Sequence, residues 1–198
     1  MTSAERAAWD SEWGDWVLDT DTDRLYQGRA GVLGGNLVGP PIGGFENYED
    51  AVTSSTPLVV PASTWTTVPN DGLGSQTNTE EKPPSVSRLF DVSNGALDIS
   101  DLKKGDQVTV RYDFVLTPSA NGSFASVRLM FGDLFPFTLT SIIGTLSNSA
   151  GTEYPYSEIV KFFVGEDDMR LAPILLQIHC SQNATLVNRG VFVSVDIK

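Results

Sequence analysis

The chain has 198 residues, of which 40% are hydrophobic and 19% are charged, so it can bury a core and is not globally disordered. Its formal net charge of −12 opposes contact with a nucleic acid backbone, which requires clustered Lys and Arg, so we expect no nucleic acid partner. The single cysteine, Cys180, excludes an intrachain disulfide and a thiolate zinc site, and the single histidine, His179, leaves little His-dependent chemistry to assemble. We expect no cofactor and no metal.

The first residues, MTSAERAAWDSEW, lack the apolar core of a signal peptide. No later run approaches the length of a membrane span. We therefore expect a soluble protein that is made in a cytoplasm and has no membrane partner.

Residues 1–50 are the most acidic part of the chain, with ten acids against three bases, or −7 of the total −12. Trp9, Trp13 and Trp16 are spaced by four and three residues, which is typical of one face of a short helix. Residues 17–26 predict a strand, a polar turn and a return strand, and the Gly-rich run 28–44 cannot form a core of its own.

We interpret residues 1–50 as an arm that becomes ordered against another surface; a flexible leader is the alternative. Tryptophan is enriched among the side chains that dominate protein interfaces, which favours an interface role for the arm. In the alternative, the tryptophans fold back onto the rest of the chain as a satellite core. The candidate partner-binding residues are Trp9, Trp13, Trp16, Leu18, Leu25, Tyr26, Val32, Leu33 and Leu37.

Residues 51–198 predict one β-domain, organised around the stretch from Val108 to Leu116. Every second residue there is apolar or aromatic, which indicates a half-buried strand. Gly105 supplies a turn before this strand, and Pro118 marks its end. Asn121-Gly122 predicts a hairpin turn into the next strand. Further strands are expected at 58–60, 64–68, 86–92, 124–131, 135–143, 157–164, 174–180 and 191–197.

These strands are separated by turns, and we find no convincing long helical period between them. The pattern predicts an all-β protein, an antiparallel β-sandwich of the jelly-roll kind, with an extended N-terminal arm.

Three segments, WTTVPNDG at 65–72, LFD at 89–91 and LDISDLKKGD at 97–106, lead into the strand at 108–116. Together they resemble the trimeric jelly-roll domains of bacteriophage fibre and capsid-decoration proteins, which are similar in build to tumour-necrosis-factor and C1q heads. The segment LDTDTDRLYQG at 18–28 resembles a hairpin found near the N-terminus of many phage fibre and head-fibre proteins, although Arg29-Ala30-Gly31 departs from the turn that usually follows. The resemblance implies a homotrimer in a virion.

Three clusters contain residue types that could support metal binding or catalysis. Asp19, Asp21 and Asp23 have the first spacings of a calcium loop, but Arg24 stands where that loop requires Gly, so an acidic hairpin edge is the better interpretation. The acids 166–168 lie in one loop, which does not give the geometry of a glycosidase pair and favours a solvated turn. His179 and Cys180 are adjacent on a strand and point to opposite faces, so Cys180 is expected to be an inert core residue.

The sequence therefore predicts a virion structural protein without enzymatic activity. We expect a capsid decoration or cement protein that binds the major capsid protein lattice as a homotrimer at the outer capsid surface and stabilises the head. The alternative is a tail-fibre or receptor-binding tip, in which the loop 72–84 recognises the host surface. A polysaccharide-degrading enzyme is a third possibility, for which we expect no release of sugar.

Overall fold

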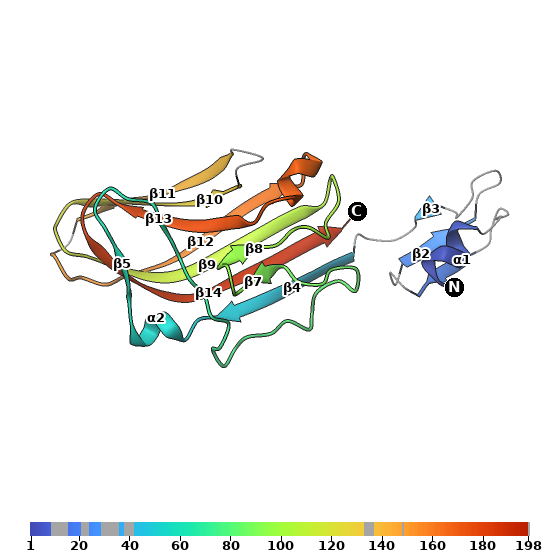
Figure 1. Cartoon of the computed structure of the whole chain (residues 1–198), viewed down its shortest axis with the longest axis horizontal. Helices are drawn as coiled ribbons and strands as arrows, with labels where there is room; N and C mark the ends of the chain where they lie inside the picture. Colours follow the sequence, from blue (N-terminus) through green and yellow to red (C-terminus); the bar gives the residue numbers. More distant parts are fainter. Residues whose placement is uncertain are drawn as a thin grey trace.

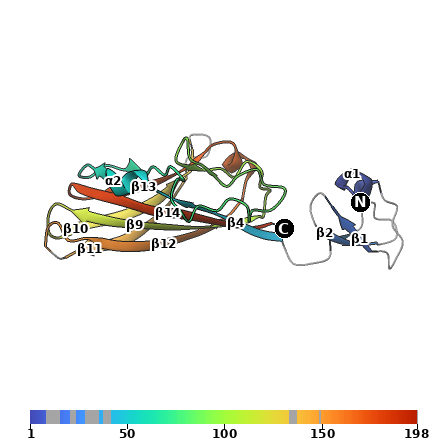
Figure 2. The same ribbon diagram turned by 90° about the horizontal axis from the view of Figure 1, so that it is seen from below.

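The computed structural model describes residues 1–8, 16–20, 24–28, 36–37, 42–132, 137–147 and 149–197. Within these residues, two stacked β-sheets form a sandwich, and a small N-terminal sheet lies beyond the end of the sandwich where β4 begins and β14 ends (Figures 1 and 2). Among the described helices, none is long and apolar enough to cross a membrane.

The first sheet of the sandwich, called the β9 sheet, has the strand order β12-β9-β14-β4, and β5 also pairs with β14. The second, called the β10 sheet, has the order β11-β10-β13-β8-β7, and β6 also pairs with β13. The strands of the β9 sheet are β4 (Ile42–Glu49), β5 (Leu58–Val60), β9 (Gln107–Pro118), β12 (Tyr154–Phe163) and β14 (Ala184–Ile197). Those of the β10 sheet are β6 (Thr66–Thr67), β7 (Phe90–Asp91), β8 (Ala96–Leu97), β10 (Ser123–Met130), β11 (Thr138–Leu146) and β13 (Ile174–Cys180).

All strand pairs of the sandwich are antiparallel, and the chain alternates between the two sheets. After β9 it crosses to β10 and β11, returns with β12, crosses again with β13 and ends in β14 beside β9. This order is that of a jelly roll, which confirms the predicted fold class. Two short helical segments decorate the sandwich, α2 (Val52–Ser55) and the 3₁₀ turn η1 (Asp167–Arg170).

The core forms because the inward positions of the long strands are apolar at a period of two. The inward residues of β9 from Val108 to Leu116 are at most 3% exposed. The same alternation holds in β14, where Val191, Val193 and Val195 are buried, and in β13, where Cys180 is buried with Ile174, Leu176 and Ile178. The predicted faces of these three strands are confirmed, including the assignment of Cys180 to the core.

The predicted hairpin at Asn121-Gly122 is wrong in its pairing. The turn itself is present, with Gly122 at a φ of +67°, but β9 pairs with β12 and β14 while β10 pairs with β11 and β13. Both strands bury one apolar face, and placing them in opposite sheets lets these faces meet across the core. The predicted turn before β9 is present, and Gly105 adopts the positive φ expected of it.

Strand boundaries differ most where side chains take over backbone hydrogen bonds. The expected strand at 86–92 shrinks to β7, because the Leu89 amide donates to the buried carboxylate of Glu46 over 2.6 Å instead of to a neighbouring strand. The strand expected at 157–164 begins earlier, at Tyr154, and that expected at 135–143 runs from Thr138 to Leu146, with residues 135–136 outside the described part of the chain.

Residues 42–49 belong to the sandwich and not to the arm. The strand β4 pairs with β14 over its full length, from Ile42 opposite Ile197 to Glu49 opposite Gly190. The division predicted at residue 50 therefore does not coincide with the start of the sandwich, which lies at Ile42. We call the part before it, residues 1–37, the N-terminal module.

Candidate interaction surfaces

The N-terminal module contains a small antiparallel sheet of its own. Strand β1 (Trp16–Asp19) pairs with β2 (Arg24–Gln27), which confirms the predicted strand and return strand; residues 21–23 between them lie outside the described part of the chain. Strand β3 (Asn36–Leu37) pairs with β2. Helix α1 (Ser3–Ala7) starts with a capping box between Thr2 and Glu5, in which each side chain accepts a hydrogen bond from the other's backbone amide.

Asp19 joins helix α1 to strand β1. Its side chain is fully buried, and its two carboxylate oxygens accept hydrogen bonds from the Ser3 hydroxyl at 3.0 and 2.9 Å. Arg6 Nε donates to Asp19 Oδ2 over 2.8 Å, and the Arg6 guanidinium lies 4.1 Å from the centroid of the Tyr26 ring. This buried ion pair gives the module an interaction of its own that does not depend on the sandwich.

The structure describes only part of the predicted binding set. Leu18 is exposed on β1, and Tyr26 is half-buried on β2 against Arg6. Trp16, Leu25 and Leu37 have described backbones in β1, β2 and β3. Trp9, Trp13, Val32 and Leu33 lie outside the described residues.

The expectation that three tryptophans share one helix face is wrong for Trp16. This residue starts strand β1 opposite Gln27, because the segment from Trp16 to Asp19 pairs with residues 24–27, which follow the polar turn in the sequence. Helix α1 ends before it, at Ala7.

In the first acidic cluster, the described acid Asp19 forms hydrogen bonds and an ion pair with neighbouring side chains of the module. Asp19 is held by Ser3 and Arg6, while Asp21 and Asp23 fall outside the described residues. Within the described part of the chain, no group of three His, Cys, Asp or Glu side chains is arranged to hold a metal ion.

The second acidic cluster, at residues 166–168, lies on the surface around η1. Glu166 pairs with Lys104 at 3.3 Å, and Asp167 pairs with Arg170 at 2.8 Å. These contacts agree with the predicted solvated turn.

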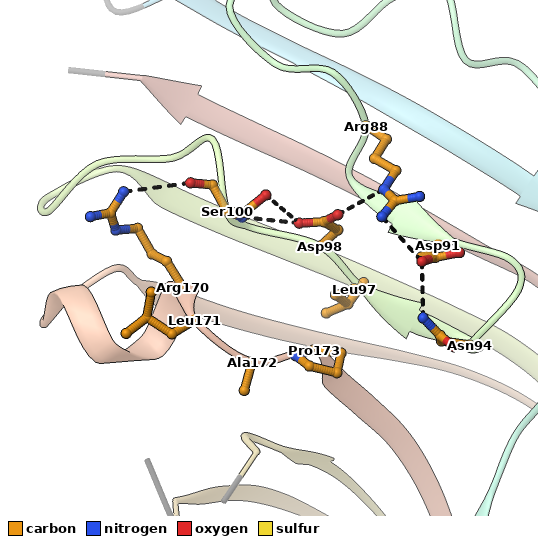
Figure 3. A pocket seen from close by; sticks show the side chains of 10 residues that line it. All are labelled: Arg88, Asp91, Asn94, Leu97, Asp98, Ser100, Arg170, Leu171, Ala172 and Pro173. Carbon is orange, nitrogen blue, oxygen red and sulfur yellow. Dashed lines mark hydrogen bonds and ion pairs between the residues drawn. The ribbon is translucent and has the colours of Figure 1, made fainter. Parts of the chain in front are cut away.

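A hollow of about 220 Å³ lies between the β7–β8 turn and residues 170–173 (Figure 3). Arg88 reaches Asp98 at 2.7 Å and Asp91 at 3.1 Å, and both carboxylates also accept hydrogen bonds from nearby serines. Burial would raise the pKa of Asp98, but hydrogen bonds from Ser100 and Arg88 outweigh it and lower that pKa. The positive charge of Arg88 is therefore neutralised by these two carboxylates. We interpret the cluster as an interaction that holds the neighbouring loops together.

The loop 72–84, to which the alternative function assigns host recognition, lies along the free edge of β4. Asn78 and Asn47 exchange two backbone hydrogen bonds of 2.8 Å, and the Phe45 amide donates to the Glu81 carbonyl over 2.9 Å. The Gly74 amide donates to the Glu49 carbonyl over 2.9 Å. The loop thus covers a sheet edge that would otherwise expose unpaired backbone groups.

The opposite side of the sandwich, between the edge strands β11 and β12, is incompletely covered. We call it the open side. Inward-facing apolar side chains that pack on the core remain only half-buried there, whereas those of β9 and β14 are buried. The Ser141 hydroxyl donates to Glu158 over 3.0 Å and links the two edge strands. The half-buried apolar residues of the open side are Leu139, Ile143, Tyr154, Tyr156 and Val160.

Exposed apolar residues surround the open side. On the outward face of β12, Ile159 is 63% exposed and Phe163 is 64% exposed. A hollow of about 340 Å³ next to the open side is lined by Phe137, Leu139, Phe162, Phe163 and Met169 together with Lys161, Gly165 and Glu166. Burial raises the pKa of Tyr156, and the nearby Tyr154 and Glu158 raise it further. These surface residues were not identified from the sequence.

The outward face of the β10 sheet carries a second group of contacting side chains. The Arg128 guanidinium lies 4.2 Å from the centroid of the Trp65 ring, and the His179 ring lies 5.2 Å from it. His179 is thus on the face opposite Cys180, as predicted, and the two residues do not form a nucleophile and base.

No family model matches the chain, and no curated protein sequence matches it. Among solved structures, it is similar to the Eiger TNF of S. frugiperda, with 10% identity, a TM-score of 0.45 and coverage of 81% of this chain and 94% of that chain. It is also similar to the PRD1 vertex protein P5, with 12% identity, a TM-score of 0.39 and coverage of 81% and 99%. A structure of infectious bursal disease virus, Gx strain, has 12% identity, a TM-score of 0.33 and coverage of 82% and 33%. We assign no function from likenesses this distant.

Proposed function

We propose that this protein is a virion structural protein without enzymatic activity, a homotrimeric capsid decoration protein of a bacteriophage. In this proposal the N-terminal module binds the major capsid protein lattice at the outer surface of the head, and the jelly roll stands outside it. The observation that carries the proposal is the division of the chain into a module with its own sheet and buried ion pair and a separate sandwich (Figure 1).

The chemistry of the module supports an attachment role. The LDTDTDRLYQG segment, which resembles the hairpin of phage fibre and head-fibre proteins, contributes the paired strands β1 and β2. Leu18 is exposed on β1, and an exposed apolar side chain on a small folded unit is suited to contact another protein. A trimer carries three such modules, so binding of the first raises the effective concentration of the others at neighbouring sites on the shell. Bound trimers would stabilise the assembled head by mass action.

The open side supports association with further copies of the chain. The strand β11 contains no charged residue, and β12 contains one acid, Glu158, and one base, Lys161, so the two edge strands add no net charge to a chain of net charge −12. Contact with a second copy would complete the burial of Tyr154, Tyr156 and Ile143. If the open side packs on a different surface of the next copy, the contact is head-to-tail and closes into a ring, as a trimer requires.

We expect Ile159→Asp to dissociate the trimer. Ile159 is 63% exposed, so the isolated sandwich should tolerate the change, but a carboxylate placed in an apolar contact between copies would be buried without a partner. Light scattering coupled to size exclusion should give the mass of one chain for the variant and of three for the wild type. Val59→Asp, at a residue 66% exposed on β5 and away from the open side, is the matched control and should remain trimeric. A trimeric Ile159→Asp variant would refute this placement of the contact.

Deleting residues 1–41 is expected to leave a folded trimer that no longer binds capsids. The deletion ends before β4, so every strand of the sandwich is retained. Binding is measured by co-sedimentation with capsids that lack the protein, and the mass of the truncated protein is measured in parallel. Undiminished decoration by the truncated trimer would contradict the assignment of attachment to the module.

A further inference from the structure

The outward face of the β10 sheet differs in charge from the rest of the molecule. Strands β6, β10, β11 and β13 contain no Asp or Glu, whereas β4, β9, β12 and β14 each contain at least one. The only basic residues in these four strands are Arg128 and His179. In a chain with 25 acids and 13 Lys and Arg residues, these four adjacent strands form an area of the described sheet without an acidic side chain, so an anion meets little local repulsion there.

Arg128 stands on this face with its charge fixed in place and not neutralised. Its Nε donates to Gln177 Oε1 over 2.8 Å, and Gln177 in turn donates to the Thr67 hydroxyl over 3.2 Å. Trp65 covers one side of the guanidinium. Among the described residues no carboxylate pairs with Arg128, whereas Arg6, Arg88, Arg111 and Arg170 each pair with one at 2.7 to 2.9 Å. Partial burial also lowers the pKa of Arg128, since no neighbouring anion offsets the loss of water.

The neighbours of Arg128 across the strands are uncharged hydrogen-bonding groups. Thr140 of β11 and Gln177 of β13 lie on either side of it in register. In the adjacent row, Ser126 lies between Ile142 and His179. A cation surrounded by hydroxyl, amide and imidazole groups, with an indole beside it, matches a ligand that combines an anionic group with many hydroxyls.

We propose that this face binds an anionic polysaccharide, with a carboxylate or phosphate group of the polymer paired to Arg128. A guanidinium whose orientation is fixed by Trp65 and Gln177 loses little freedom when it forms two parallel hydrogen bonds to such a group. The sugar hydroxyls would exchange hydrogen bonds with Thr140, which is exposed beside Arg128. This inference does not depend on the proposed capsid attachment, because the site lies on the sandwich and not on the N-terminal module.

The test uses the full chain and polymers that share one backbone. Carboxymethyl dextran and dextran phosphate supply the two anionic groups, neutral dextran supplies neither, and poly-glutamate supplies carboxylates without sugar. Binding is measured by calorimetry and by the shift of the Trp65 indole N–H signal in NMR spectra. We expect binding to at least one anionic dextran, a shifted Trp65 signal, and no binding to neutral dextran.

Arg128→Gln should weaken this binding at least tenfold. The matched control is Arg111→Gln, because Arg111 also lies over an aromatic ring, that of Phe192, on the outward face of the other sheet, but it pairs with Asp113 at 2.9 Å. The control should bind like the wild type. If Arg128→Gln unfolds, Arg128→Lys keeps the charge without the planar fork and should weaken binding severalfold.

Other results would overturn the proposal. One is that neither anionic dextran binds. Another is that Arg111→Gln weakens binding as much as Arg128→Gln does. A third is that the Trp65 indole N–H signal does not shift when the polymer binds. If poly-glutamate binds more tightly than both anionic dextrans, the face is suited to an acidic protein partner, and the proposal that it binds a polysaccharide is overturned.

Discussion

Phe114→Ala is expected to lower the free energy of unfolding of the sandwich by about 3 to 5 kcal/mol, the range for removing a buried aromatic side chain. Phe114 lies in the middle of β9 and is 1% exposed. Its ring stacks on Tyr112 at a centroid distance of 4.8 Å and contacts Tyr156 of β12 at 5.5 Å. Removing the ring leaves a cavity bounded by strands on both sides of β9, so the surroundings cannot close over it.

The matched control is Phe124→Ala, because Phe124 is 38% exposed on the outward side of β10. Removing the Phe124 ring should lower the free energy of unfolding by about 1 kcal/mol or less, since much of this ring is already in contact with water. Both variants are compared with the wild type by urea unfolding at one protein concentration, because the stability of an oligomer depends on concentration. If the two substitutions lower the free energy of unfolding equally, β9 is not the centre of the core.

The parts of the fold that were predictable are those where one face of a strand is apolar without interruption. In β9, β13 and β14, a shift of one residue would turn the whole apolar set toward water, so the burial of each residue follows from the sequence. Boundaries and faces agree closely with expectation in β9 and β13. The strand β14 instead begins at Ala184, well before the expected start at 191, because the buried Asn188 and a register shift before Gly190 interrupt its apolar alternation.

The strand β4 could not be found in this way, because its inward residues are Gly44, Glu46 and Tyr48. Glu46 is 1% exposed and is stabilised by the Tyr48 hydroxyl at 2.8 Å, the Leu89 amide at 2.6 Å and the Lys82 ammonium at 3.6 Å. Burial raises the pKa of Tyr48, and its hydrogen bond to Glu46 raises it further. Such a network is assembled from distant segments, so local periodicity carries no sign of it.

The connection after β9 was equally hidden, since Asn121-Gly122 is compatible with a hairpin and with a crossing between sheets. The choice depends on which faces meet across the core, which is a property of the whole sandwich.

The open side has a local signal in the sequence, namely apolar residues on both faces of an edge strand. In β12 both faces are apolar, with Val160 and Phe162 inward and Ile159 and Phe163 outward. An antiparallel sheet with one solvated face usually carries polar residues on that face. Exposed apolar residues on the outward face of β12 are therefore the signal that fits the contact between copies proposed above. The outward face of the β10 sheet around Arg128 has a different sequence signal. Its strands β6, β10, β11 and β13 lack Asp and Glu, although they are far apart in the sequence and adjacent only in the sheet.

Asp19→Ala is expected to unfold the N-terminal module and leave the sandwich intact. Asp19 is fully buried and is the acceptor for both Ser3 and Arg6, so its removal leaves the Arg6 guanidinium without that carboxylate. Breaking a buried ion pair by removing one partner costs about 3 to 5 kcal/mol. A module of a few short strands cannot offset that loss, because small units bury little apolar surface. Hydrogen exchange should therefore show loss of protection in β1 and β2 with the sandwich unchanged.

The matched control is Asp167→Ala, which removes an Asp–Arg pair of the same 2.8 Å length from the surface, where Asp167 is 74% exposed. Exposed pairs contribute about 0 to 1 kcal/mol, so this variant should keep the stability of the wild type. If the proposed attachment is correct, Asp19→Ala should also reduce capsid binding to the level of the protein that lacks residues 1–41. A variant with an unfolded module and full capsid binding would show that attachment does not require β1 and β2, whereas a protected module in Asp19→Ala would show that the ion pair does not hold it together.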